Sequence, residues 1–384
     1  MRIEQRRWRS ADDWTAVAGA NLREPPQLVL IFGARGVMKD HGLIGQIMGA
    51  YPGAHYVGCS TAGEISGTEV SDDSVVTTAI HFAHTCIHGG KIALRHAGES
   101  YQAGAGLART MPPEGLRHVL VFSDGLSVNG SDLVRGLTDH LPKGVTVTGG
   151  LAGDGASFTE TLIMWDGMPE GGAVAAVGFY GDRLRVGFGS QGGWDPFGPE
   201  RLITRSEGNV LYELDGRSAL DLYRKYLGEH AGGLPATGLL FPLSLRLRPN
   251  DTPVVRTILG VNEAEKSLTF AGDVPEGSSA RLMKANIDRL IDGAVGAAHT
   301  SFSAVGPVSP ELAVLISCVG RKLVLKQRVE EEVEGVCGVL GGSAVITGFY
   351  SYGEIAPFMQ DARCELHNQT MTVTTFSEGQ GVGK

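Results

Sequence analysis

Three segments of this chain repeat one order of elements, and that repeat limits the fold more than any other feature of the sequence. Each segment has an apolar strand, a helical stretch, a second strand and then a glycine-rich turn with an acidic residue. The pairs of strands are expected at residues 28–32 and 55–57, 119–122 and 145–148, and 312–316 and 344–347. A strand, a helix and a strand within about 30 residues are typical of a parallel βαβ crossover. The sequence therefore predicts an α/β fold of mixed sheets with βαβ units and an internal duplication.

The turns after the second strands carry the strongest candidates for a binding site. The first and third turns, residues 58–65 and 348–355, share Gly, Gly, Glu and Ile at the same spacing. Turns at the carboxyl ends of parallel strands lie where open α/β sheets form binding crevices. Exposed N–H groups of such a turn can hold a carboxylate, while Glu64, Glu354 or Asp154 could accept an ammonium group. A small zwitterion such as an amino acid would satisfy both.

The alternative is that these carboxylates only cap neighbouring backbone or pair with an arginine. If the turns form the site, substitution of Glu64 or Glu354 by glutamine should weaken ligand binding more than folding. The candidate ligand-binding residues of the three turns are Cys59, Ser60, Thr61, Glu64, Asp154, Tyr352 and Glu354.

An enzyme is the less favoured interpretation. Ser60 follows a strand on a sharp glycine turn, but the spacing Gly58-x-Ser60-x-x-Gly63 is not the G-x-S-x-G of a nucleophile elbow. The sequence places no histidine to act as its base, so a small-molecule hydrolase that uses Ser60 is only the alternative. Residues 187–192 match G-x-G-x-x-G, but the prolines within residues 194–199 prevent the helix that would bind a pyrophosphate. We therefore expect neither catalysis nor nucleotide binding.

One segment has the composition of a metal or heme site. On a strand, His84, Cys86 and His88 would lie on one face, which is enough to ligate zinc, and each could be an axial heme ligand. The competing interpretation is the exposed face of an edge strand. Other candidate axial ligands are His55, His367 and Cys318. We retain His84, His88 and His367 as heme candidates and assign no metal site.

Composition excludes several classes of protein. Lys and Arg number 33 against 42 Asp and Glu, a net charge of −9 that argues against a nucleic-acid partner. The longest apolar blocks, such as residues 173–177, are far shorter than the roughly 18 residues of a membrane span. Five cysteines without a CxxC pair fit free thiols in a reducing compartment. We expect a soluble cytoplasmic protein with no membrane partner.

Helix and turn signals predict the remaining organisation. A capping box and a Pro-Pro stop predict an N-terminal helix within residues 1–26. Residues 229–237 are rich in Gly, Ala and Pro and are a candidate boundary between two halves. Other expected elements are a hairpin over residues 172–189, a helix over 279–298, and a terminal strand and tail over 365–384.

Several ordered segments resemble the signature segments of the FIST family. They include residues 58–65, 149–155, 204–217, 317–321, 348–357 and 366–370. The resemblance implies an N-terminal FIST domain over about residues 27–217 and a C-terminal FIST domain over about residues 218–364.

The resemblance also implies a function in signal transduction, as a sensory module that binds a small molecule such as an amino acid. One branch of the family is similar to stand-alone heme proteins that sense nitric oxide and regulate a histidine kinase or a cyclic-di-GMP enzyme. No kinase or cyclase segment is expected within this chain, so its output would pass through a separate protein. We therefore expect a sensor of a small ligand or of heme that acts through a partner.

Overall fold

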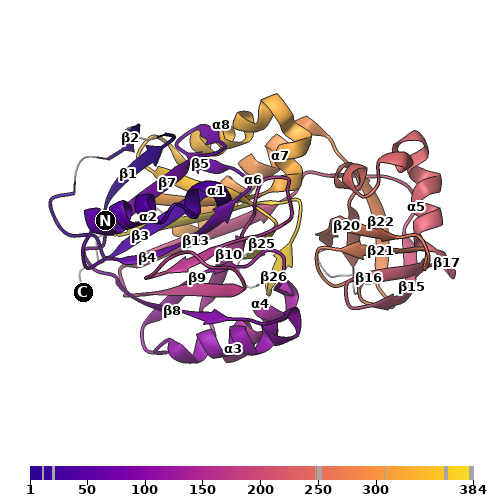
Figure 1. Cartoon of the computed structure of the whole chain (residues 1–384), viewed down its shortest axis with the longest axis horizontal. Coiled ribbons are helices and arrows are strands. Elements are labelled where there is room, and N and C mark those ends of the chain that lie inside the picture. The colour runs from indigo at the N-terminus through magenta and orange to yellow at the C-terminus, as the bar shows by residue number, and fades with distance from the viewer. Residues whose placement is uncertain are drawn as a thin grey trace.

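The computed structural model describes residues 1–10, 13–19, 22–246, 248, 253–306, 308–358 and 362–379. Figure 1 shows two parts, a large body of mixed sheets with helices on its outside and a smaller domain that projects from one end. Within those residues, no helix combines the length and the apolar composition needed to cross a membrane. The predicted α/β class with mixed sheets is confirmed.

Each predicted repeat forms a parallel pair of strands joined by helices, which confirms the βαβ units. The pairs are β3 (Leu28–Ala34) with β4 (His55–Thr61), β9 (Leu116–Ser123) with β10 (Thr146–Leu151), and β23 (Leu312–Cys318) with β24 (Val345–Ser351). The helices between them are α1 (Arg35–Met38), α2 (His41–Ala50), α4 (Gly130–His140), α7 (Val319–Leu325), η4 (Lys326–Arg328) and α8 (Val329–Leu340).

Antiparallel strands complete the three sheets on one side. Next to the first strand of each pair lie β7 (Val75–His81), β12 (Ala173–Tyr180) and β27 (Met371–Glu378). Beyond them lie β1 (Arg2–Trp8) with β2 (Trp14–Ala18), β8 (Cys86–Ala93), and β13 (Leu184–Gln191). The remaining helices of the body are η1 (Ala97–Glu99), α3 (Ser100–Thr110) and α6 (Ile287–Val305).

Alternation along the strands places one face of each of these three sheets in a shared core. In β3, Phe32 faces that core, whereas the neighbouring Ile31 packs with the apolar face of α2 on the outside. The rings of Phe32, Phe122 and Phe349, one from each repeat, meet in the core with centroids 4.9–6.0 Å apart. The body is therefore three-sided, with sheets inside and helices outside.

The strand that follows each glycine-rich turn leaves its own repeat and joins another. β5 (Glu64–Ser66), which carries β6 (Glu69–Ser71), pairs with β24 of the third repeat. β11 (Ile163–Trp165) pairs with β4 of the first repeat. β25 (Gly353–Pro357), which carries β26 (Cys364–His367), pairs with β10 of the second repeat. This cyclic exchange locks the three repeats into one unit.

The smaller domain forms one further sheet with its own apolar core. Its elements are β14 (Asp195–Pro196), β15 (Arg201–Glu207), β16 (Val210–Leu214), β17 (Arg217–Ser218), α5 (Ala219–Leu227), η2 (Gly228–Gly233), η3 (Ala236–Leu240), β18 (Leu243–Arg246), β19 (Val254–Arg256), β20 (Ile258–Asn262), β21 (Ser267–Phe270) and β22 (Ser279–Lys284). Its sheet includes strands from both sides of residue 217, so the sequence boundary at 217/218 does not divide the structure. The segment 229–237 lies within this domain and does not separate two halves of the chain.

Three predicted elements were wrong. The N-terminal helix is replaced by strands β1 and β2, because Trp14, Thr15 and Val17 are residues that favour a pleated, half-buried surface. Residues 279–284 form β22, which pairs with β18, so the expected helix begins only at Ile287 after the Asn286 cap. The expected hairpin over 172–189 does not form, since β12 and β13 belong to different sheets. Residues 11–12, 20–21 and 380–384 of the predicted terminal segments lie outside the described residues.

Candidate functional site

A pocket of about 590 Å³ lies between the body and the smaller domain. On the body side it is lined by residues at the carboxyl ends of parallel strands, including Gly125 after β9, Leu151 in β10 and Cys318 in β23. On the other side it is lined by Ile258 and Phe270 of the smaller domain. A crevice was predicted at the carboxyl ends of parallel strands. The sequence did not predict that the smaller domain contributes the opposite wall of the pocket.

Exposed apolar side chains gather at this pocket. Six large apolar side chains are exposed among the described residues, and four of them line it. These four are Leu126 (43% exposed), Phe158 (40%), Leu259 (48%) and Leu323 (38%). Soluble proteins rarely leave clustered apolar surface in water unless it contacts a ligand or a partner. Sequence reasoning missed all four, because their only shared signal is exposure in the folded chain.

The polar side chains of the pocket are few and uncharged. Tyr352, Asn129, Asn209 and Thr257 line it, together with Cys318, and no charged residue does so within the described part of the chain. Burial raises the pKa of the Cys318 thiol, so this side chain is a neutral thiol at ordinary pH. The pocket therefore offers shape, apolar contact and a few hydrogen bonds.

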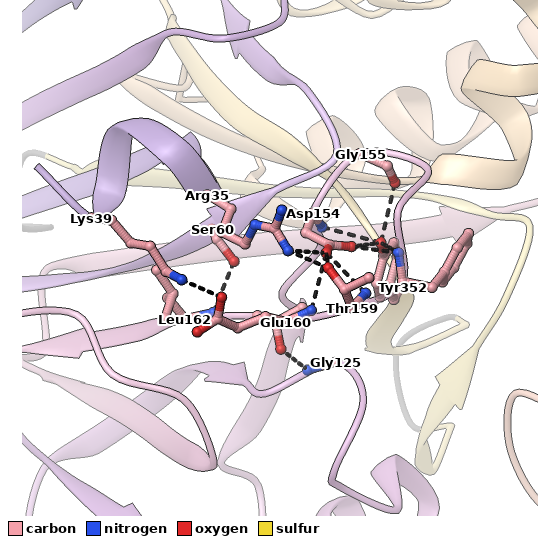
Figure 2. A network of polar contacts seen from close by, with 12 residues as sticks. Arg35, Lys39, Ser60, Gly125, Asp154, Gly155, Thr159, Glu160, Leu162 and Tyr352 are labelled. Atoms are coloured by element: carbon pink, nitrogen blue, oxygen red, sulfur yellow. Dashed lines mark hydrogen bonds and ion pairs between the residues drawn. The ribbon is translucent and has the colours of Figure 1, made fainter.

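Asp154 organises the wall of the pocket next to Tyr352 (Figure 2). Its Oδ1 accepts hydrogen bonds from the Tyr352 hydroxyl and from the amide of Phe158, the latter at 2.8 Å. Its Oδ2 accepts from the Arg35 guanidinium at 3.0 Å, from the Thr159 amide and hydroxyl, and from the Glu160 amide. Among the described residues, six donors thus reach the Asp154 carboxylate.

These contacts determine the pKa values of Asp154 and Tyr352. Burial alone would raise the pKa of Asp154, but the hydrogen bonds from Tyr352, Thr159 and Glu160 outweigh it and hold the pKa below its usual value. Burial and the Asp154 carboxylate together raise the pKa of Tyr352. The Tyr352 ring stacks on Phe158, with centroids 4.4 Å apart. Two residues that line the pocket are therefore positioned by one ionised carboxylate.

Glu64 and Glu354 lie in matching environments, away from the pocket. The Glu64 carboxylate accepts hydrogen bonds from Thr61, three residues earlier, and from the amide and hydroxyl of Ser74. Glu354 accepts from Ser351, also three residues earlier, at 2.6 Å, and from the amide and hydroxyl of Thr370. Both side chains are fully buried, and burial raises their pKa values to about 7 and about 8. Each glutamate joins its turn to a more distant segment.

Cys59 and Ser60 lie in β4 and are fully buried. The Ser60 hydroxyl accepts a hydrogen bond from the Leu162 amide at 2.9 Å, which helps to hold the segment before β11 against β4. Burial raises the pKa of the Cys59 thiol well above its usual value. Of the seven predicted ligand-binding residues, only Tyr352 lines the pocket, and Asp154 supports it from behind.

The three candidate heme ligands lie outside the pocket. His84 and His88 are exposed, His84 beside Arg183 and His88 on the edge strand β8 against the Tyr180 ring. His367 is fully buried, and its Nε2 is 2.8 Å from the Ala356 carbonyl oxygen. His84, His88 and His367 are therefore not placed to ligate a heme in this pocket, whereas Cys318, another axial candidate from the sequence, lines it. In the described ranges, no three His, Cys, Asp or Glu side chains come close enough together to hold a metal ion.

Comparison with models of known protein families identifies two domains in the chain. The FIST N domain matches residues 27–217 and the FIST C domain matches residues 219–357. The chain belongs to the FIST family. FIST domains are sensory domains that bind ligands in signal transduction. The C-terminal match covers most of the smaller domain and the third repeat, so the exchanged strands and the pocket both combine residues of the two FIST domains.

Two relatives of this FIST protein carry names that describe them as uncharacterized proteins. A protein of Methanocaldococcus jannaschii is 27% identical over 202 residues, which are 50% of this chain and 38% of that protein. A protein of Mycobacterium tuberculosis is 25% identical over 268 residues, or 67% of each chain. Among solved structures, cyanuric acid hydrolase from A. caulinodans aligns over 92% of this chain and 90% of its own, with 8% identity and a TM-score of 0.33. A similarity this low supports no inference about activity.

Proposed function

We propose that this FIST protein senses a small molecule that binds in the pocket between the body and the smaller domain. The observation that carries the proposal is the convergence of Leu126, Phe158, Leu259 and Leu323, from both parts of the molecule, on one pocket. Ligand sites are typically concave and mainly apolar, with a few placed polar groups. This pocket has that composition, and it lies at the carboxyl ends of three strands.

A ligand in this pocket would contact two parts that the chain connects at two places. The chain enters the smaller domain through residues 192–194 and leaves it through residues 285–286. These two connections lie together, since the Asn286 amide donates to Asp195 at 2.9 Å. Hydrogen bonds also join the two parts: the Arg256 guanidinium donates to the Leu366 carbonyl at 2.9 Å, the Asn129 amide to Asp273 at 3.2 Å and the Gln369 amide to the Leu239 carbonyl at 3.4 Å. A small apolar cluster includes Leu325 of the body and Leu240 of the smaller domain. Two adjacent connections are the arrangement of a hinge.

Binding can therefore be converted into a change in the position of the smaller domain. A ligand shifts an equilibrium only if it binds one arrangement more tightly than the other. A molecule that touches Leu259 and Leu126 at once does so, because those contacts exist only when the two parts are close. We propose that a separate signalling protein, such as a histidine kinase or a cyclic-di-GMP enzyme, reads this position.

The test uses N-phenyl-1-naphthylamine, an uncharged dye whose fluorescence increases in apolar surroundings. The variants Leu259→Asp and Leu323→Asp each place a charge in the pocket, and we expect either to weaken dye binding by about tenfold or more. Leu202→Asp is the matched control, because Leu202 is 49% exposed and does not line the pocket. Equal dye binding by all these variants and the unsubstituted chain would contradict the proposal.

The second part of the test measures the hinge. Hydrogen exchange of β20 and β21 should slow when the dye is bound, since the closed arrangement would be more populated. In Leu259→Asp this protection should disappear at the same dye concentration. If hydrogen exchange of β20 and β21 slows equally in the unsubstituted chain and in Leu259→Asp, dye binding is not coupled to a movement of the smaller domain. That result would exclude the hinge as the output.

A further inference from the structure

The pocket offers no partner for a charged ligand. No arginine, lysine, histidine, aspartate or glutamate is among the lining residues within the described ranges. Asp154 is the carboxylate next to Tyr352, but each of its oxygens already accepts several hydrogen bonds. The oxygens of Glu64 and Glu354 are likewise occupied by donors from the chain. A buried charge without a partner is strongly unfavourable, so this pocket selects against ions and zwitterions.

Two polar side chains on the wall formed by the smaller domain have hydrogen-bonding atoms that no group in the described residues uses. The Asn209 side-chain amide donates to the Phe270 carbonyl at 2.8 Å, and its Oδ1 accepts no hydrogen bond within the described residues. The Thr257 hydroxyl is buried and has no partner in the same part of the chain. Buried polar groups are normally paired, so the unpaired Thr257 hydroxyl costs stability, whereas the half-buried Asn209 is open to a partner from the pocket. Both residues line the pocket, so a ligand can supply what they lack.

We infer that the ligand is an uncharged, mainly apolar molecule with an N–H or O–H group that faces Asn209 and Thr257. The inference rests on the proposed function, because it concerns the same pocket. It differs from the amino-acid ligand expected from the sequence. The apolar part of the ligand contacts Leu126, Leu323 and Phe158, while its donor contacts the smaller domain.

The test compares three probes that share one ring system, using displacement of N-phenyl-1-naphthylamine from the full chain. Indole is uncharged and has an N–H group, 1-methylindole lacks that group, and L-tryptophan adds a zwitterion to the same ring. We expect indole to displace the dye and L-tryptophan to bind at least about tenfold more weakly. We expect 1-methylindole to bind about fivefold more weakly than indole, which corresponds to one hydrogen bond.

A variant of the same shape isolates the hydrogen bond. Thr257→Val removes the hydroxyl and keeps the volume, so the chain should fold at least as well, because no unpaired group is left. In this variant the difference in affinity between indole and 1-methylindole should shrink, whereas L-tryptophan should still bind weakly. The same comparison in Asn209→Ala tests the second acceptor.

The outcomes separate the two proposals. Dye binding with tryptophan equal to or tighter than indole would overturn the inference and leave the sensor function standing. Dye binding that indole does not displace at millimolar concentration would also overturn the inference. Failure of the dye and all three probes to bind the folded chain would overturn both.

Discussion

Arg35 donates a hydrogen bond to Asp154 at 3.0 Å, and this ion pair joins the first repeat to the turn of the second. Tyr352, from the third repeat, donates to the other oxygen of the same carboxylate. One buried side chain thus holds a residue from each repeat at the point where the pocket begins (Figure 2). A network of this kind links the packing of the body to the shape of the binding site.

Asp154→Asn should destabilise the chain and weaken binding in the pocket. The amide keeps only one oxygen, so its NH₂ group would face the donors of Thr159 and Glu160, and Arg35 would lose its charge partner. We expect a loss of about 2–4 kcal/mol in the free energy of unfolding, measured with urea. N-phenyl-1-naphthylamine should also bind more weakly, because Tyr352 and Phe158 lose their anchor. Asp182→Asn, at an exposed ion pair with Arg117, is the control and should change little.

Gly149→Ala should have a severe effect, because a side chain at this position has no room. A Cβ at Gly149 would lie 1.9 Å from the Val121 carbonyl oxygen of the parallel strand β9. Gly58 and Gly348 are blocked in the same way by the Ile31 and Leu315 carbonyl oxygens. We expect a loss of more than about 3 kcal/mol or failure to fold.

The control is Gly144→Ala, in the loop before β10. Gly144 has a φ of +88° and open space around it, so alanine there should cost only about 1–2 kcal/mol of backbone strain. Similar unfolding midpoints for the two alanine variants would show that the close approach of the strands is relieved by small shifts and is not what requires glycine.

The repeat could be predicted because its signals are local. Apolar strands such as residues 28–32 and the glycine turns after β4 and β24 follow from neighbouring residues. The exchange of β5, β11 and β25 between repeats depends on pairings far apart in the sequence, and no local pattern encodes it.

Only part of the candidate site could be predicted, because only some of its residues lie in segments with a local sequence signal. Tyr352 and Asp154 lie in glycine turns that the sequence marks. Leu259 and Asn209 come from the smaller domain and approach those turns only in the folded chain. Glu64 and Glu354 were found by their motif, but a motif does not state whether a carboxylate faces a ligand or its own backbone. Here both face the chain.

His118 and His367 should make the chain less stable in mild acid. Burial lowers the pKa of His118 to about 3 and that of His367 to about 4, so both are neutral in the folded state. In the unfolded chain they bind protons below about pH 6.5, so the free energy of unfolding falls as the pH drops from 6.5 toward 4. Urea unfolding at pH 6.5 and pH 5 should show this loss, about 2 kcal/mol for each histidine.

Substitution of His118 tests whether this histidine causes the loss of stability in acid. His118 lies between the hydroxyls of Thr146, at 2.7 Å, and Thr148, at 3.0 Å, and glutamine can keep part of this pairing. His118→Gln should lower stability at pH 6.5 and reduce the slope below it. The exposed His96→Gln should leave the slope unchanged. A slope that is the same in all three proteins would mean that other groups bind the protons.

Glu64 and Glu354 should have the opposite effect above pH 6.5. Their folded pKa values, about 7 and about 8, lie above the usual value of 4.5 because both carboxylates are buried. Between those limits the folded chain keeps a proton that the unfolded chain has lost, so stability falls as the pH rises. In the window from pH 6.5 to pH 8 the glutamates dominate, because the two histidines are neutral in the folded chain and the unfolded chain loses only about half a proton from each of them. We expect a fall of about 2 kcal/mol across it.

Glutamine substitution tests this and also separates folding from binding. Glu64→Gln and Glu354→Gln resemble the protonated acid, so each should flatten the decline in stability between pH 6.5 and pH 8, and the double variant should flatten it most. Glu114→Gln, at an exposed position, should retain the decline. Because neither buried glutamate lines the pocket, N-phenyl-1-naphthylamine should bind the folded single variants as it binds the unsubstituted chain. If Glu64→Gln or Glu354→Gln instead loses dye binding without losing stability, the glycine-rich turns that carry these glutamates would be part of the ligand site, as their motif suggests.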